Sequence, residues 1–177
     1  MGKWNNFYLR RMGTDENSSP YDTYESVKTW GIWCKSIPFK LYDKVKEPAK
    51  RSWNDEHGDD EFLPTDGLFM DAYTMDVEFG CKIMTSQHDS IVFGKTVSDV
   101  RANVGEFIEY LRTSGMMMFY SSYSRIGRQK VRLSEIHDDA VWKSDDDQEF
   151  LIFKVTFKVN DPITNVILTD NQLEPDE

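Results

Sequence analysis

The chain has 177 residues, of which 39% are hydrophobic and 29% are charged, and this balance is typical of one folded domain. The formal net charge of −10 argues against proteins that bind duplex nucleic acid or an anionic membrane surface through Lys and Arg. No segment reaches the roughly 20 apolar residues that a membrane-spanning helix needs. The N-terminal sequence MGKWNNFYLRRMG lacks the apolar core of a secretion signal, so we expect synthesis without export.

The first part of the chain is predicted to contain one strand region between two irregular segments. Residues 1–26 are polar and mixed, and we expect them to form an N-terminal arm. The alternation in residues 27–45 predicts one bent strand or two short strands, with Pro38 at an edge because proline cannot donate to a ladder. Residues 46–67 contain two prolines, two glycines and a run of acids, which predicts a long loop.

The middle of the chain shows the two clearest periodicities. Residues 68–84 alternate between apolar and polar side chains, which predicts a half-buried strand of an antiparallel sheet. Residues 96–114 carry apolar side chains three and four positions apart, which predicts an amphipathic helix. We expect Gly115 to end this helix in a left-handed conformation, whereas Gly105 either lowers its stability or marks a close contact.

The C-terminal half is predicted to be mostly strands. Residues 116–123, 131–136 and 149–160 are rich in β-branched, aromatic and other apolar side chains. Residues 137–148 are acidic and predict a loop. Residues 165–177 are predicted to form an acidic C-terminal tail, with at most a short edge strand before it.

This order of elements predicts the fold class. A strand region, a long loop, a strand, one helix and then several strands do not form the alternating units of a parallel sheet. We therefore predict a mainly β (α+β) fold: an antiparallel β-sandwich or small barrel with one flanking α-helix at about residues 96–114. The single domain is expected to span residues 27–164.

The residue pattern offers no catalytic, metal or cofactor site. The three histidines are far apart and lack a second His or Cys at the short spacing of a zinc site. Cys34 and Cys81 occur in apolar, strand-like contexts, which predicts two buried thiols. The sequence contains neither a nucleophile elbow nor a phosphate-binding glycine loop. We therefore expect a non-enzymatic protein without cofactors.

Two clusters leave alternatives open. The methionine-rich run at residues 116–120 predicts either an adaptable binding surface or, as we favour, a strand with two buried faces. A basic cluster predicts either pairing with acidic loops of a neighbouring copy or a solvated hairpin. Its members are Arg125, Arg128, Lys130 and Arg132.

Several motifs, taken in order, resemble a known family. A loop of the form R-x-W-x-D-x-x-G precedes a long strand, then come a helix, a strand and a compact hairpin with Gly127, and the last long strand ends in F-K-V-N-D-P. The loop motif consists of Arg51, Trp53, Asp55 and Gly58. Over residues 27–164 this arrangement resembles the N-terminal domain of phage distal tail proteins and the related tail tube proteins.

The resemblance implies a β-sandwich or small barrel with a flanking helix, without catalysis or cofactor. In that family, copies form a ring, usually six-fold, around a channel that passes DNA without binding it specifically, and the long loop often reaches a neighbouring subunit. In this chain that loop is residues 46–67, with Trp53 as the expected anchor. The residues expected at the oligomer interface are Arg51, Trp53, Asp55, His57, Gly58, Phe62, Leu63, Arg125 and Arg128.

The leading hypothesis is a structural protein of a phage tail or tail-like particle, made in the bacterial cytoplasm and located in the virion tail. Its expected partners are further copies of itself and other tail proteins, and no membrane. Distal tail proteins commonly carry a second, carbohydrate-binding-like domain, for which 177 residues leave no room, and this favours a minimal ring, tube or connector protein. The alternative is a β-sandwich module that binds carbohydrate or another surface ligand through exposed aromatic side chains.

Overall fold

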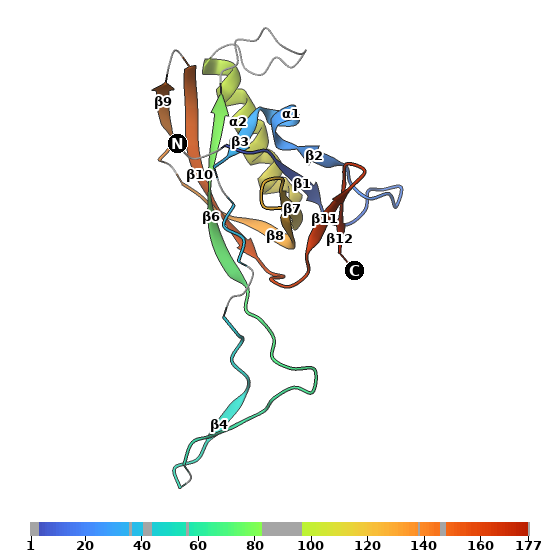
Figure 1. Ribbon diagram of the computed structural model, residues 1–177, viewed down its shortest axis with the longest axis vertical. Coiled ribbons are helices and arrows are strands. Elements are labelled where there is room, and N and C mark those ends of the chain that lie inside the picture. The colour runs from blue at the N-terminus through green and yellow to red at the C-terminus, as the bar shows by residue number, and fades with distance from the viewer. Residues whose placement is uncertain are drawn as a thin grey trace.

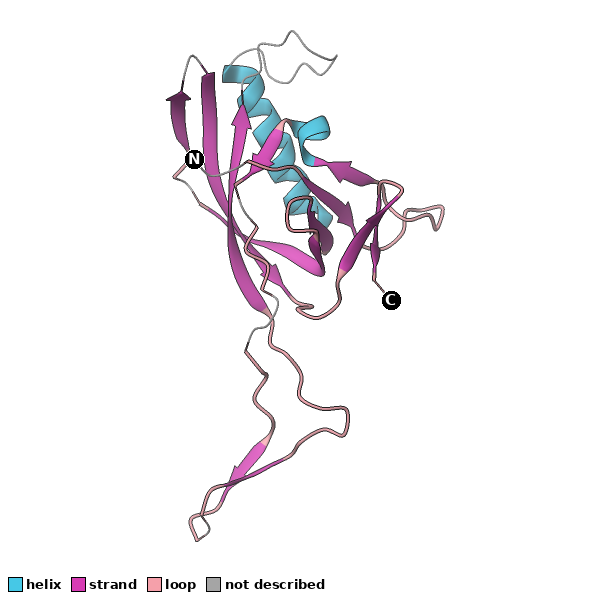
Figure 2. Ribbon diagram, in the orientation of Figure 1, coloured by secondary structure: helices cyan, strands magenta, loops and turns pink. Residues whose placement is uncertain are grey.

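A computed structural model shows how the chain folds, and it describes residues 4–35, 37–40, 44–55, 57–82, 97–137, 139–145 and 148–176 (Figures 1 and 2). The elements, in chain order, are β1 (Phe7–Arg11), β2 (Thr23–Glu25), α1 (Ser26–Trp30), β3 (Ile32–Cys34), β4 (Lys50–Ser52), β5 (Asp59–Glu61), β6 (Tyr73–Lys82), α2 (Val97–Ser114), β7 (Met117–Ser121), β8 (Ile126–Ile136), β9 (Val141–Asp145), β10 (Gln148–Val159), β11 (Val166–Thr169) and β12 (Gln172–Pro175).

The main sheet is antiparallel throughout and curls back on itself. Its strand order is β2-β1-β7-β8-β10-β6-β3, with β9 paired to β10. Just before β1, Asn5 forms an antiparallel bridge with Cys34 of β3, with N–O distances of 2.8 and 2.9 Å. The N-terminal extension of β1 is thereby paired with β3, the last strand of the path, and the sheet closes into a small barrel. This confirms the predicted mainly β fold with one substantial helix.

The longest pairing of the sheet confirms the predicted strand at residues 149–160 and, over residues 73–82, the one predicted at 68–84, whose first five residues lie outside any strand. Ten residues of β6 pair with ten of β10, from Tyr73 opposite Val159 to Lys82 opposite Phe150. The apolar positions of β6 from Tyr73 to Cys81 are buried, as their alternation predicts. Ile83, the last residue of the predicted apolar face, lies outside the described residues.

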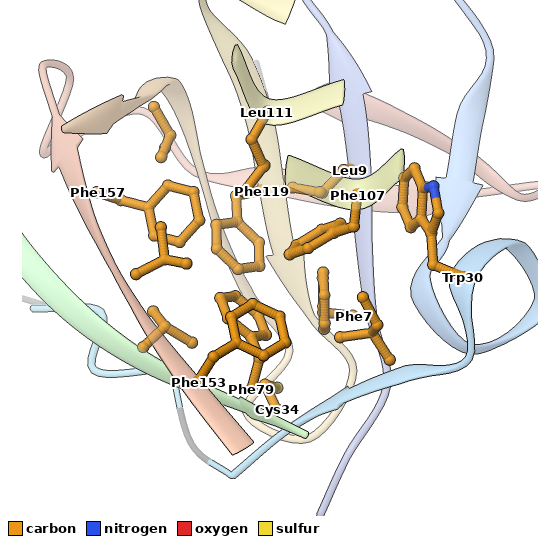
Figure 3. Close-up of a cluster of buried hydrophobic side chains, with 14 of the residues drawn as sticks. Phe7, Leu9, Trp30, Cys34, Phe79, Phe107, Leu111, Phe119, Phe153 and Phe157 are labelled. Atoms are coloured by element: carbon orange, nitrogen blue, oxygen red, sulfur yellow. The ribbon is translucent and has the colours of Figure 1, made fainter. Parts of the chain in front are cut away.

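The inner face of the curled sheet holds an aromatic core, shown in Figure 3. Phe79 of β6 lies at its centre, with ring centroids 5.2 Å from Phe7, 5.3 Å from Phe107, 5.5 Å from Phe153 and 6.1 Å from Phe157. These rings come from three strands and one helix. The core therefore depends on pairings between segments far apart in the sequence.

Helix α2 packs its apolar stripe onto this core. Val100, Phe107 and Leu111 are buried at spacings of seven and four residues, which confirms the predicted amphipathic helix. Gly115 follows α2 with φ 65°, the left-handed conformation expected at a helix end. A Cβ added at Gly105 would meet no atom within 4 Å, so this glycine marks no close contact.

The predicted N-terminal arm has to be corrected, because part of residues 1–26 belongs to the barrel. Strand β1 lies between β2 and β7, and Phe7 and Leu9 are fully buried. Alternation is present in β1, but five residues among polar neighbours are too few to stand out in the sequence.

The strand prediction for residues 27–45 is only partly right. Residues Ser26–Trp30 form the short helix α1, which ends at Gly31 with φ 66°, and among the described residues of this segment only Ile32–Cys34 form a strand. The ring of Trp30 packs against Phe107 of α2 with centroids 5.2 Å apart. A one-turn helix is too short to show a helical period, and its buried Trp30 imitates the alternation of a strand.

The C-terminal predictions also need correction. Residues 165–177 contain the hairpin β11–β12, whose Val166 and Leu173 are fully buried. This hairpin covers Met118 on the outer side of β7, while Met117 lies in the main core. The methionine-rich run is therefore a strand with two buried faces, as favoured above. Within the predicted acidic loop at residues 137–148, β9 pairs with β10.

Candidate interaction surface

The most distinctive surface of the molecule is a long ribbon that leaves the barrel before β6. We call residues 44–72 the arm; Figure 1 shows it extending away from the barrel. Its two legs are joined at the base by a bridge between Val45 and Met70, with Lys46 N donating to Phe69 O at 2.7 Å. Near the tip, β4 and β5 pair over three residues. The loop predicted at residues 46–67 is thus a two-legged ribbon held by backbone hydrogen bonds.

The arm exposes apolar side chains to solvent. Phe62 is 72% exposed, Leu63 60%, Phe69 57% and Leu68 53%. A cluster of exposed large apolar residues on one projection is typical of a surface that meets another molecule. The sequence predicts Phe62 and Leu63 as interface residues, whereas it predicts Leu68 and Phe69 as part of the following strand.

The predicted interface residues of the loop motif lie at or near the tip of the arm. The guanidinium carbon of Arg51 lies 4.1 Å from the ring centre of Trp53, which is 43% exposed. Asp55 and His57 are exposed, and Gly58 has φ 89°, a conformation that side-chain-bearing residues rarely adopt. The arrangement presents an aromatic ring, a guanidinium and carboxylates on a narrow projection.

The two arginines predicted from the β7–β8 hairpin are in different environments. Arg125 is exposed at the turn with φ 55°. Arg128 is only 5% exposed, and its guanidinium donates to Asn165 Oδ1 at 3.2 Å and to Lys40 O at 3.3 Å. Arg128 therefore joins the C-terminal hairpin to the segment before the arm, and its side chain is not at the surface of the single chain.

A second surface feature, which the sequence did not indicate, lies where the arm meets the barrel. It is a hollow of about 600 Å³ whose walls come from both legs of the arm and from strands β6, β8 and β10. We call it the basic hollow. The lining residues that define it are Lys40, Lys44, Asp71, Tyr73, Arg132 and Lys158. These residues are spread over more than a hundred positions, so only the folded chain brings their charges together.

A row of polar groups on the barrel contains a hydroxyl, an imidazole and a carboxylate, the group types of a hydrolytic triad. Thr156 Oγ1 lies 2.8 Å from His137 Nε2 and donates to Asp76 Oδ1 at 2.6 Å. An activated nucleophile would instead give its proton to the histidine. This row therefore lacks the geometry of a nucleophile with its base. Among the residues that the structure describes, no group of three or more His, Cys, Asp or Glu side chains could hold a metal ion.

The two thiols are buried, as predicted. Cys34 and Cys81 are free, and burial raises the pKa of each to about 12. Reactive cysteines have lowered pKa values and partial exposure, so these two are structural. No helix in the described part of the chain has the length and apolar character to cross a membrane.

The fold and the arm define a class of protein: a small antiparallel barrel, covered by one helix, with a long projecting ribbon before its longest pairing. No family model and no curated protein sequence matches the chain. Among solved structures, it is similar to the Dit protein of phage SPP1, described as a paradigm of the hub adsorption apparatus in phages that infect Gram-positive bacteria.

The similarity to Dit has a TM-score of 0.51 at 15% sequence identity. It covers 91% of this chain and 52% of Dit, so the chain spans about half the length of that protein. Nearly the whole chain therefore has a Dit-like fold, which confirms at the level of fold the resemblance to distal tail proteins seen in the sequence.

Proposed function

We propose that this protein is a structural component of a phage tail or tail-like particle, in which copies associate into a ring. The observation that carries this proposal is the fold shared with Dit over 91% of the chain. The second support is the arm, which projects from the barrel and exposes large apolar side chains to solvent.

The physical state of the arm favours association. An isolated two-stranded ribbon is at best marginally stable in water, because it has no face packed on a core. Burial of Phe62, Leu63 and Trp53 against a neighbouring copy would remove apolar surface from water and hold the ribbon in place. We infer that these three side chains are the apolar anchors of the interface. Arg128, which is buried in the single chain, is not among them.

The charge of the chain fits the same proposal. A net charge of −10 gives little attraction for phosphates, so a ring of this protein would let DNA pass through its channel without retaining it. In this proposal the partners are further copies of the chain and other tail proteins, the location is the virion tail, and no catalysis is involved.

Light scattering after size exclusion, together with negative-stain microscopy, tests the proposal over a wide range of protein concentration. We expect symmetric particles much larger than one chain. A protein that remains monomeric at every concentration, alone and with other tail proteins, would contradict it. Binding to a glycan array, lost on removal of an exposed aromatic residue, would instead support the carbohydrate-binding alternative.

The variant Trp53→Ala tests the role of the arm within this proposal. Trp53 is 43% exposed and stacks on Arg51 at the far end of the arm from the barrel, so its removal should weaken assembly more than folding. Ile163→Ala is the matched control, because Ile163 is 64% exposed but lies outside the arm. A melting temperature lowered by many degrees with unchanged assembly would show that Trp53 serves the fold instead.

A further inference from the structure

Three of the cations that line the basic hollow, Lys44, Arg132 and Lys158, have no acidic partner among the described residues. Arg132 of β8 and Lys158 of β10 are direct partners in the register of two adjacent strands, and both line the hollow. Like charges placed directly opposite each other on a sheet are destabilising. Among the described residues, no carboxylate oxygen lies within 4 Å of a nitrogen of Lys44, Arg132 or Lys158.

A buried charge close to the hollow adds to its positive potential. Arg128 is 5% exposed and has no carboxylate partner among the described residues, and its Nη2 donates to Lys40 O at the edge of the hollow. Water screens a buried guanidinium less than an exposed one. The hollow is lined by four cations and, of the acidic residues, by Asp71 alone among those described, so in a chain with a net charge of −10 it is a local site for a negatively charged group.

The tip of the arm carries the complementary charges. Strand β5 consists of Asp59, Asp60 and Glu61, and all three side chains are exposed. Lys50 pairs with Asp59 at 3.4 Å, whereas Asp60 and Glu61 make no ion pair with any described residue. The acidic tip is narrow, and the hollow is open and concave.

We propose that the acidic tip of the arm, formed by Asp60 and Glu61, docks in the basic hollow of a second copy of the chain. This rests on the proposed self-association and names the two surfaces that carry it. The arm extends away from the barrel while the hollow lies at its base, so the tip of an arm faces another copy's hollow rather than its own (Figure 1). Such a contact joins two different surfaces, and its head-to-tail repetition produces a closed ring or an open filament, whereas reciprocal exchange between two copies would produce a two-fold dimer.

Sedimentation velocity of the full chain and its variants tests this docking. The variant K44E/K158E reverses the charge of the hollow, and D60K/E61K reverses that of the tip. Each alone should raise the concentration for half-association about tenfold, as expected for the loss of a few partly exposed ion pairs. The wild type should also dissociate between about 50 mM and about 500 mM salt, because screening weakens exposed ion pairs.

An equimolar mixture of the two variants provides the sharpest readout. The unchanged acidic tip of K44E/K158E fits the unchanged basic hollow of D60K/E61K. The reversed, basic tip of D60K/E61K fits the reversed, acidic hollow of K44E/K158E. Association should therefore return in the mixture to the wild-type level. Urea unfolding of each variant separates a failure to fold from a failure to associate.

A matched pair of single variants controls for net charge. Lys158→Glu should keep the fold stable, because the new carboxylate faces Arg132 across the strands, yet it should weaken association. Arg101→Glu changes the net charge equally at an exposed position of α2 and should leave association unchanged.

The possible failures are distinguishable. A wild type that never associates would overturn both this docking and the proposed ring. A wild type that associates while both double variants associate equally well, or a mixture that stays dissociated, would overturn the docking alone. Binding of duplex DNA that K44E/K158E abolishes, with association unchanged, would also overturn it and assign the hollow to nucleic acid.

Discussion

Gly127 of β8 and Val166 of β11 approach so closely that a Cβ added at Gly127 would lie 2.9 Å from both the Cβ and the carbonyl oxygen of Val166. The contact seats the C-terminal hairpin on the outer side of the barrel, where Val166 and Leu173 are fully buried. Since one of the crowded atoms belongs to the backbone, a larger residue cannot be accommodated by a simple side-chain rotation.

Gly127→Ala should therefore destabilise the protein by about 1–3 kcal/mol, the usual cost of overpacking a buried site. Urea unfolding measures this change. Limited proteolysis should at the same time show faster cleavage within residues 163–176, because the hairpin is displaced. An unchanged unfolding midpoint would mean that β11 is not seated against Gly127 as described.

Gly105→Ala should raise the free energy of unfolding in the same urea experiment, whereas Gly127→Ala lowers it. Gly105 is exposed in the middle of α2, and an added Cβ would meet nothing within 4 Å. Alanine is favoured over glycine in a helix interior by about 1 kcal/mol, so the free energy of unfolding should rise by up to that amount. A loss of stability would show that another copy or partner covers this face of α2.

Phe79→Ala should be among the most damaging single changes in the core. The ring of Phe79 is fully buried and lies within 5.5 Å of Phe7, Phe107 and Phe153. Removal of a buried Phe side chain costs about 3–5 kcal/mol, through lost burial and the cavity left behind. Phe62→Ala removes the same atoms from an exposed site on the arm and should change the stability of the single chain by less than about 0.5 kcal/mol.

Stability should fall at alkaline pH because of the two buried thiols. Burial raises the pKa of Cys34 and of Cys81 to about 12, whereas a thiol in the unfolded chain titrates near about 8.5. Between these values the unfolded chain releases protons that the folded chain retains. The stabilisation is thus fully present below about pH 8.5 and is lost progressively as the pH rises toward about 12.

Urea unfolding at a series of pH values from neutral to about pH 10 measures this loss. The pKa of Tyr110 is also raised to about 12 by burial, which contributes in the same direction at the upper end of the range. In Cys34→Ala/Cys81→Ala, the slope of the unfolding free energy against pH should become shallower, whatever the variant's absolute stability. A slope equal to that of the wild type would show that the thiols are not the groups responsible.

The sequence by itself determined the elements whose buried faces follow from a local periodicity of apolar residues. The alternation of β6 and β10 and the three-and-four spacing of α2 define buried faces that the structure confirms, because side-chain direction follows from backbone geometry within each element. Gly115 at the end of α2 is local in the same sense, since glycine adopts a left-handed φ without the steric cost that a Cβ brings.

Only the tertiary structure decided which distant segments complete the barrel and where charge collects. Strand β1 is a short segment in a polar context, yet it occupies the interior of the sheet, and Asn5 closes the barrel through Cys34. Arg128 is one of several cations in the sequence pattern, but in the fold it is buried and donates to Asn165 and to Lys40 O. The basic hollow combines Lys44 with Lys158, residues that approach only through strand pairing and the base of the arm. Such contacts arise from pairing between segments far apart in the sequence, and a local periodicity cannot predict them.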